Sequence, residues 1–171
     1  MHYRRVRIEG ATYFFTVVTH DREKLFVNPA TVKLLNDAIA KVRDRHPFEI
    51  EANVVLPDHL HALWTMPEGD AAYATRWRLI KETFTRSYLK TAKMPVRTEA
   101  ARNRGEQPIW QRRFWEHTIR DETDFKTHLD YIHVNPVRHG LVKSAGEWSH
   151  STLSKWVELG VYEPGWGTGE T

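Results

Sequence analysis

The sequence contains no cysteine in its 171 residues, and this absence excludes disulfides, thiolate metal ligands and cysteine nucleophiles. No stretch approaches the roughly 18 apolar residues that a transmembrane helix needs. Residues 1–5 lead into a strand-like segment and lack the apolar core of a signal peptide. No internal repeat or linker divides the chain. We therefore expect a soluble, cytoplasmic protein in which residues 1–171 form one domain, with about 143–171 as a C-terminal tail.

The composition indicates a folded protein with one strongly basic region. Apolar residues make up 40% of the chain, which includes 7 Trp. Between residues 76 and 113, eleven Lys and Arg side chains stand against three Glu, a net charge of +8, so the total of +3 leaves −5 for the rest. The aromatic residues among these charges are Trp77, Phe84, Tyr88 and Trp110. The combination suits a phosphate backbone with bases stacked on rings, although a solvated helix face followed by a flexible loop gives a similar pattern.

Hydrophobic periodicity and turn residues predict the order strand, helix, strand, strand, helix, strand, helix. The expected strands are 11–19, 48–56, 59–66 and a short one within 109–119, and the expected helices are 29–45, 73–90 and one that begins after Asp121. Residues 93–107 show no periodicity and are expected to form a mobile basic loop. This is the ferredoxin-like βαββαβ order, so the sequence predicts an α+β protein whose antiparallel sheet carries helices on one face.

His59 and His61 stand one residue apart in the third expected strand. Side chains alternate between the two faces of a strand, so both imidazoles point the same way while Leu60 points into the core. Two neighbouring imidazoles supply two of the three ligands that a divalent-metal site needs. Taken alone, the pair is equally compatible with two half-exposed histidines, so its interpretation depends on the rest of the sequence.

Tyr131 and Asn135 stand one helical turn apart on the last expected helix. Both lie off the apolar stripe of that helix and share one of its faces, although a helical tyrosine more often packs in a core. Phenols ionise near pH 10, so a tyrosine nucleophile needs help from a nearby cation, for which the nitrogen and oxygen donors suit Mg²⁺ or Mn²⁺. The histidine pair, the phenol and the amide together indicate metal-assisted phosphoryl transfer through a covalent tyrosine intermediate.

Several motifs, in a fixed order over about residues 4–148, resemble the REP-associated tyrosine transposases, an IS200-like branch of the HUH single-tyrosine transposase superfamily. The matching segments are 54–61 (VVLPDHLH), 76–81 (RWRLIK), 109–117 (IWQRRFWEH), 125–130 (FKTHLD), 131–137 (YIHVNPV) and 140–142 (GLV), whereas 90–107 resembles an insertion. The resemblance implies that His59, His61 and Asn135 bind the metal ion and that Tyr131 is the nucleophile.

The resemblance also implies a substrate and a reaction. Such proteins cleave single-stranded DNA beside hairpins called REP sequences, and they form a 5′-phosphotyrosine link that can be resealed to another strand. The ester keeps the bond energy, so no nucleotide cofactor is implied, which agrees with the lack of a glycine-rich phosphate loop. A module that binds hairpin DNA without cutting it is the alternative, and a replication or conjugation initiator is a third reading. The sequence leaves open whether the protein is a monomer or a homodimer.

Seven further residues receive secondary assignments from their type and position. They are Arg78, Lys81 and Arg113 as phosphate contacts in preference to simple salt bridges, Glu116 and His117 as supporting active-site or DNA-binding residues or structural ones, and His128 and His133 as residues that surround the ligands or lie on the surface, in preference to ligands themselves.

Overall fold

Four antiparallel strands form the centre of the protein, in the order β2-β3-β1-β4. The computed structural model describes residues 7–92, 99, 103 and 109–169. The strands are β1 (Thr12–Val18), β2 (Glu49–Val55), β3 (His59–Thr65) and β4 (Trp115–Thr118). The helices are α1 (Pro29–Arg45), α2 (Tyr73–Tyr88), α4 (Glu122–Arg138) and α5 (Leu153–Glu158), with the 3-10 turns η1 (His20–Arg22), η2 (Leu25–Val27) and η3 (Ala145–Glu147).

The strand order and the element order are those of a ferredoxin-like sheet, which confirms the predicted α+β fold. Strand β3 pairs with both β1 and β2, and its register places His61 opposite Thr16 and His59 opposite Val18. Most of the expected basic loop at 93–107 lies outside the described residues.

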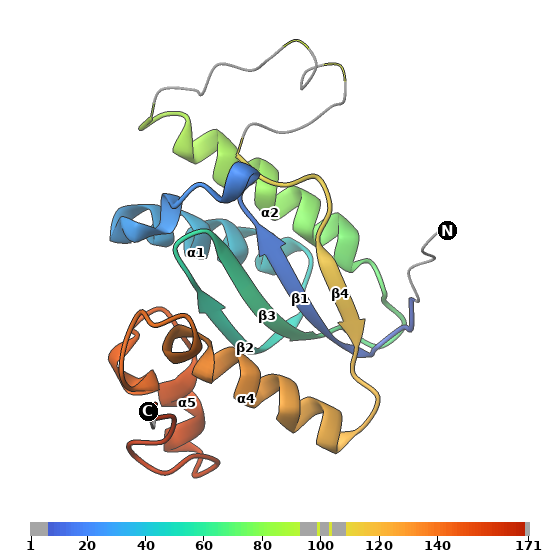
Figure 1. Cartoon of the computed structure of the whole chain (residues 1–171). Coiled ribbons are helices and arrows are strands. Elements are labelled where there is room, and N and C mark those ends of the chain that lie inside the picture. Colours follow the sequence, from blue (N-terminus) through green and yellow to red (C-terminus); the bar gives the residue numbers. More distant parts are fainter. Residues whose placement is uncertain (1–6, 93–98, 100–102, 104–108, 170–171) are drawn as a thin grey trace.

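Helices α1 and α2 cover one face of the sheet (Figure 1). The helix α1 begins where the sequence predicts, because the Asn28 side chain accepts a hydrogen bond from the Ala30 N–H and Pro29 suits the first turn. Its buried residues recur at helical spacing and face the sheet, as the periodicity indicates.

The aromatic residues of the basic region belong to the core under α2. Trp77 stacks on Trp64 of β3 with ring centroids 4.1 Å apart. Trp77, Phe84 and Trp110 are each 1% exposed or less. The prediction that these three rings stack on bases is therefore wrong: their apolar area stabilises the contact between α2 and the sheet.

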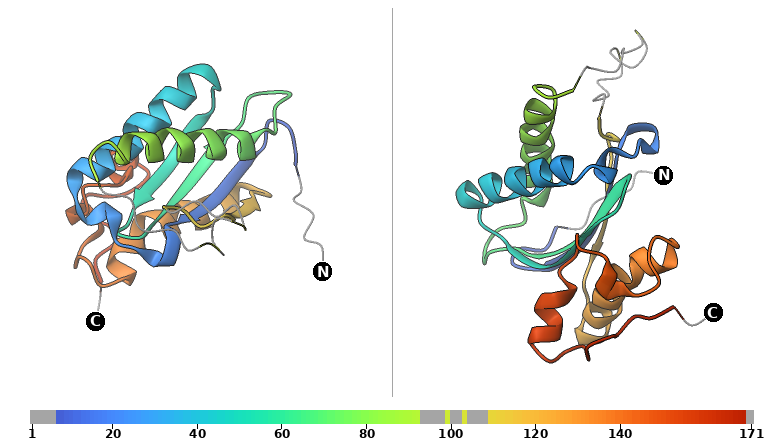
Figure 2. Two further views of the ribbon diagram at one scale, coloured as in Figure 1. Left: turned by 90° about the horizontal axis from the view of Figure 1, so that it is seen from above. Right: turned by 90° about the vertical axis from the view of Figure 1, so that its left-hand side faces the viewer.

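Helices α4 and α5 and the turn η3 lie on the opposite face of the sheet, as the right-hand view of Figure 2 shows, so the prediction that helices cover only one face is wrong. The segment after residue 143, expected to be a tail, packs on this face. Two indoles of this segment form hydrogen bonds with strand β2. Trp148 Nε1 donates to the Val55 carbonyl and Trp156 Nε1 donates to the Glu51 carbonyl, both at 2.9 Å. Within the described ranges, no helix combines the length and the apolar character needed to cross a bilayer.

Helix α4 begins at the predicted cap, where the Asp121 carboxylate accepts a 2.7 Å hydrogen bond from the Asp124 N–H. It continues to Arg138, two residues beyond Pro136. Pro136 falls in the last turn, so its missing N–H costs one hydrogen bond without ending the helix before Asn135. Tyr131 and Asn135 therefore keep helical spacing.

Candidate active site

The two histidines of β3 and the tyrosine of α4 meet between the sheet and the helix. The rings of His59 and His61 lie 4.9 Å apart, and the Tyr131 ring lies 5.2 Å from that of His61. Asn135 follows Tyr131 by one turn on the same side of α4 and is 1% exposed. The predicted site residues are thus brought together from segments about 70 residues apart in the sequence.

Each histidine is held through Nδ1. The His61 Nδ1 lies 2.8 Å from Thr16 Oγ1, and the His59 Nδ1 lies 2.6 Å from Asp58 Oδ1. Neither bond engages Nε2, and the two rings lie beside Tyr131 of α4 and beside His139. Burial lowers the pKa of His59, and it lowers the pKa of His61 to about 3. At neutral pH both imidazoles are uncharged, which is the form that binds a metal ion.

Two buried atoms of this site fit a divalent cation. His61 Nε2 and Asn135 Oδ1 have no hydrogen-bond partner among the described residues. Leaving a buried polar atom unpaired costs about 1–3 kcal/mol, so such atoms usually have a ligand. Two imidazole nitrogens and an amide oxygen form a neutral donor set compatible with Mg²⁺ or Mn²⁺.

Three residues complete the surroundings of the site and were not identified from the sequence. The Phe14 ring lies 5.4 Å from the His61 ring and 5.8 Å from the Tyr131 ring. His139, just after α4, lies 5.4 Å from the His59 ring, and the Arg138 guanidinium lies 5.7 Å from the Tyr131 ring. Only the position of Arg138, seven residues after Tyr131 on one helix, could have been read from local spacing.

The chain is similar to known proteins over nearly its whole length. Residues 7–135 match the family described as "Transposase IS200 like". A REP-associated tyrosine transposase of Escherichia coli (strain K12) is 43% identical over 164 residues, which span 96% of this chain and 89% of the relative. This chain belongs to the REP-associated tyrosine transposases.

A second relative and a solved structure are also similar to this transposase. A putative REP-associated tyrosine transposase of Haemophilus influenzae is 40% identical over 165 residues, covering 96% of this chain and 92% of the relative. The solved structure of a REP-associated tyrosine transposase bound to a REP hairpin has a TM-score of 0.80 and 41% identity, covering 99% of this chain and 92% of that one.

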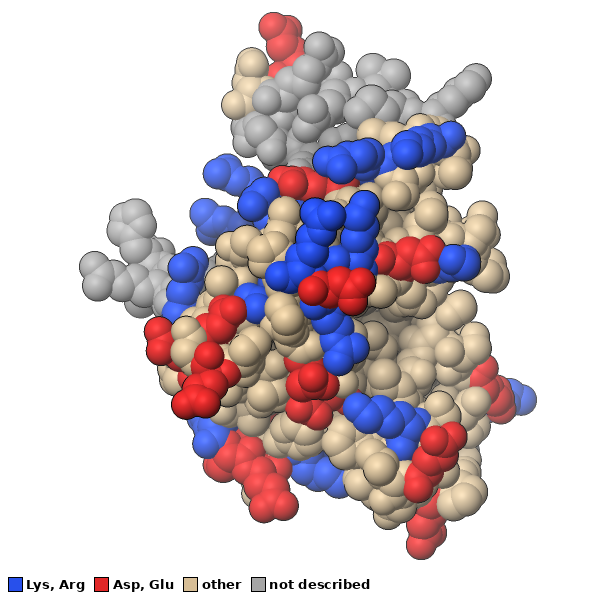
Figure 3. Space-filling model, turned by 180° about the vertical axis from the view of Figure 1, so that it is seen from behind, with Lys and Arg blue, Asp and Glu red and all other residues tan. Residues whose placement is uncertain are grey.

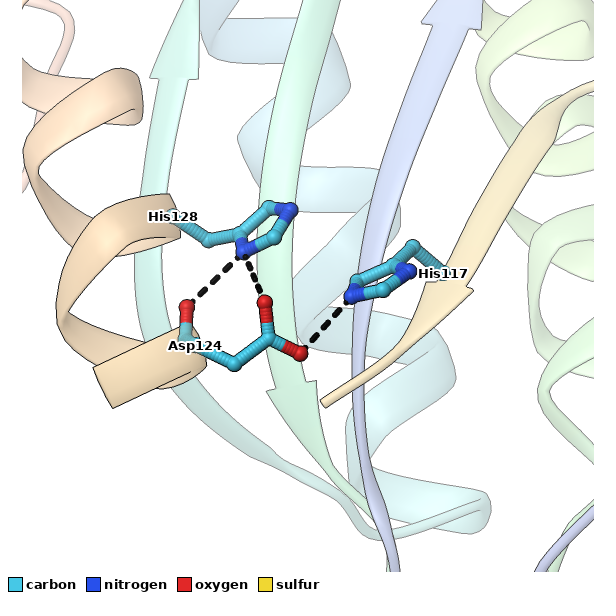
Figure 4. A group of neighbouring side chains, drawn as sticks. All are labelled: His117, Asp124 and His128. Carbon is cyan, nitrogen blue, oxygen red and sulfur yellow. Dashed lines mark hydrogen bonds and ion pairs between the residues drawn. The ribbon is translucent and has the colours of Figure 1, made fainter. Parts of the chain in front are cut away.

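A second polar group joins strand β4 to helix α4 and consists of His117, Asp124 and His128 (Figure 4). His117 Nε2 lies 2.8 Å from Asp124 Oδ2, and His128 Nδ1 lies 3.2 Å from Asp124 Oδ1 and 2.8 Å from the Asp124 carbonyl oxygen. Burial alone would raise the pKa of Asp124, but hydrogen bonds from His117 and from the Arg120 backbone and side chain lower it. His117 thus contacts the helix that carries the tyrosine, and His128 is half-buried.

Two other residues singled out from the sequence, Glu116 and His133, do not belong to this group. Glu116 precedes His117 in β4 and lies opposite Phe15, whose ring belongs to the core under α2. Glu116 therefore points to the other face of the sheet from Tyr131. His133 is fully buried on α4, with Nε2 2.8 Å from Thr152 Oγ1. Its place is at the contact with the C-terminal segment.

The three basic residues assigned to DNA contacts differ in their exposure. Lys81 is 8% exposed, and its ammonium donates to the Gln111 carbonyl at 3.0 Å, which ties α2 to the segment before β4. Arg78 is exposed and pairs with Glu82 at 2.9 Å, and Arg113 is exposed. The space-filling view from behind shows Lys and Arg gathered mainly in its upper half (Figure 3).

Proposed function

We propose that this transposase cuts and rejoins single-stranded DNA at REP-type hairpins through a 5′-phosphotyrosine intermediate. His59, His61 and Asn135 would hold an Mg²⁺ or Mn²⁺ ion, and Tyr131 would be the nucleophile. The observation that carries the proposal is the position of Tyr131, whose ring contacts the ring of His61 beside two unpartnered buried donor atoms. The choice of DNA follows from the similar transposase whose structure is bound to a REP hairpin.

The cleavage step is a transesterification at phosphorus. The Tyr131 hydroxyl oxygen forms a bond to the scissile phosphorus, and the bond from phosphorus to the 3′ oxygen breaks. The phenol loses its proton and the departing 3′ oxygen gains one, which leaves a free 3′-OH. The 5′ phosphate stays on Tyr131 until a 3′-OH of another strand attacks it, so the cycle consumes no nucleotide cofactor.

The surrounding residues orient these groups. A bound divalent ion would supply Lewis acidity to a phosphate oxygen. The Asp58 carboxylate accepts the Nδ1 proton of His59 and so leaves Nε2 of that ring available, and the Thr16 hydroxyl can accept from His61 in the same tautomer. Phe14 forms an apolar wall beside Tyr131. The Arg138 guanidinium places a positive charge where negative charge develops in the transition state.

Exposed basic side chains suit the DNA backbone outside the catalytic centre. Arg78 and Arg113 are exposed and remain in the proposal as phosphate contacts. Lys81 is better assigned to the contact with Gln111 described above. A DNA substrate also agrees with a cytoplasmic location, and one chain carries the whole group of four catalytic and metal-binding residues, so a monomer suffices for the chemistry.

A gel assay for the covalent intermediate tests the proposal. The full chain is incubated with a REP-type hairpin oligonucleotide that carries a single-stranded 5′ flank and Mn²⁺, and the covalent protein–DNA band is quantified. Tyr131→Phe should abolish the band, because only the attacking oxygen is removed. Hairpin affinity should change by less than about 0.5 kcal/mol, or about twofold.

Tyr88→Phe is the matched control, since it removes a phenol oxygen from a half-buried tyrosine on α2. It should form the adduct as the wild type does. An adduct in the Tyr131→Phe variant would assign the nucleophile to another residue. Hairpin binding without any adduct in the wild type would favour the alternative of a non-catalytic DNA-binding module.

A further inference from the structure

The group formed by His117, Asp124 and His128 has the geometry of a cation site. His117 comes from β4, whereas Asp124 and His128 are spaced i, i+4 on α4. One ligand atom from each lies within 4.8 Å of the other two. The distances of 2.8 Å and 3.2 Å from the carboxylate oxygens to the imidazole nitrogens match neighbouring ligands around one ion, which stand about 3 Å apart when each is about 2.1 Å from the metal.

We propose that His117, Asp124 and His128 bind a second divalent cation, separate from the ion held by His59, His61 and Asn135. Two imidazoles and one carboxylate bind transition-metal ions such as Zn²⁺ and Mn²⁺ more tightly than they bind Mg²⁺. Asp124 adds a negative charge that the neutral donors of the first site lack, so the second site attracts a cation more strongly.

The protons at this group do not prevent binding. A neutral imidazole carries one proton on either nitrogen, so His117 can hold its proton on Nδ1 while Nε2 binds the ion. His128 donates from Nδ1 to the Asp124 carbonyl oxygen, so its proton moves to Nε2 and this hydrogen bond is exchanged for the bond to the ion. The His117 and His128 side chains are 29% and 21% exposed, which gives the ion a path from solvent. The Arg120 side chain is 75% exposed and can leave Asp124 Oδ2, where the Arg120 N–H remains as a hydrogen-bond donor.

The group is already ordered before an ion arrives. The Asp124 side chain is 6% exposed and lies in the first turn of α4. The rings of His117 and His128 stack at 4.6 Å with an interplanar angle of 17°, and the Phe14 ring lies 4.9 Å from that of His128. A site whose ligands are fixed in advance loses little conformational entropy on binding.

The second site lies beside the nucleophile without sharing a ligand with the first. Phe14 contacts the rings of His61 and His128, so its side chain stands between the two sites. Along α4, Tyr131 follows His128 by three residues. A cation held by Asp124 would therefore add positive charge on the helix that carries Tyr131, where it would attract the DNA backbone.

Metal titration of the full chain, without DNA, tests this proposal independently of the DNA reaction. Ion-free protein is titrated with Zn²⁺ by calorimetry, and Co²⁺ absorption in the visible range reports the ligand field. The variant His59→Ala/His61→Ala removes the first site and should keep one tight cation. Adding His128→Ala should lower the affinity for that cation by more than about 100-fold, because loss of a ligand exceeds the 10–100-fold effect of losing a supporting partner.

Glu122→Gln is the matched control, because it removes an exposed negative charge two residues before Asp124 on the same helix and should leave the second cation in place. Circular dichroism and thermal melting verify that each variant is folded, and His117→Gln serves as a second ligand variant if His128→Ala is not. The proposal is overturned if His59→Ala/His61→Ala binds no tight cation, or if the second cation persists in the folded ligand variant.

Discussion

The hydroxyl of Thr16 controls the orientation of His61, so Thr16→Val should weaken the first metal site without removing a ligand. Thr16 lies directly opposite His61 in the β1–β3 ladder, and Thr16 Oγ1 is 2.8 Å from His61 Nδ1. When Nε2 binds the ion, the proton resides on Nδ1 and is donated to the threonine oxygen. Valine keeps the branched shape but offers no acceptor for this proton.

The magnitude follows from that one hydrogen bond. Loss of a partner that orients a metal-binding histidine costs about 10–100-fold in affinity, which corresponds to about 1–3 kcal/mol. The ring of His61 is 3% exposed, so water does not readily replace the lost acceptor. The free energy of unfolding should fall by about 1 kcal/mol as well, because the buried imidazole loses one hydrogen bond and keeps only the one to the Phe15 backbone.

The assay is calorimetric titration with Mn²⁺, restricted to the binding event that His59→Ala/His61→Ala removes. Thr12→Val is the control, since Thr12 lies on the same face of the same strand and its Oγ1 is 2.7 Å from Thr65 Oγ1. It should lower stability by a similar amount and leave Mn²⁺ affinity unchanged. Equal Mn²⁺ affinities for the two valine variants would refute the role assigned to Thr16.

The remaining predictions concern the DNA backbone, the tyrosine and the fold. Hairpin affinity should fall with salt by a log–log slope of about −0.7 per single-strand phosphate contact, and Arg113→Ala should make that slope shallower; a flat wild-type response contradicts the assignment. Arg138→Ala should slow adduct formation at least about tenfold with hairpin affinity retained, measured by single-turnover gels. Asp70→Asn should cost about 1–3 kcal/mol in urea unfolding at pH 7, because the buried Arg76 guanidinium loses its bidentate partner. The hydrogen bond from Arg76 lowers the pKa of Asp70, so this stabilisation is present above the ordinary carboxyl pKa and the two proteins should converge as pH falls below it.

Local patterns were sufficient for the strands and helices up to α4, but not for η3 and α5, and for the residues that a single element brings together. Period-two alternation placed His59 and His61 on one face, and helical spacing placed Tyr131 and Asn135 on another. What joins these two faces is the packing of α4 against the sheet, which depends on contacts between segments about 70 residues apart. The family resemblance supplied that connection, because neither the strand period nor the helical period shows which helix packs beside which strand.

Apart from Arg138, the features missed from the sequence are non-local. Nothing in the local sequence distinguishes Thr16 from other strand threonines, and only the β1–β3 register places it opposite His61. Lys81 fits a basic surface helix, but its aliphatic chain is buried and its ammonium reaches a carbonyl 30 residues away. The C-terminal segment lacks periodicity because single indoles such as Trp148, and not an amphipathic stripe, attach it to β2.

The spacing of polar residues along α4 is itself an argument for function. Asp124, His128, Tyr131 and Asn135 recur at i, i+4, i+7 and i+11, the spacing by which a helix normally buries apolar side chains against a sheet. Each apolar side chain forgone at a fully buried position costs about 1.5–3 kcal/mol of burial energy, and Asn135 and Asp124 are 1% and 7% exposed. Apolar side chains at these positions would give a more stable helix–sheet contact, but they would leave no polar site. The two buried polar residues on this stripe, Asp124 and Asn135, therefore support the proposals that both halves of the stripe bind a cation.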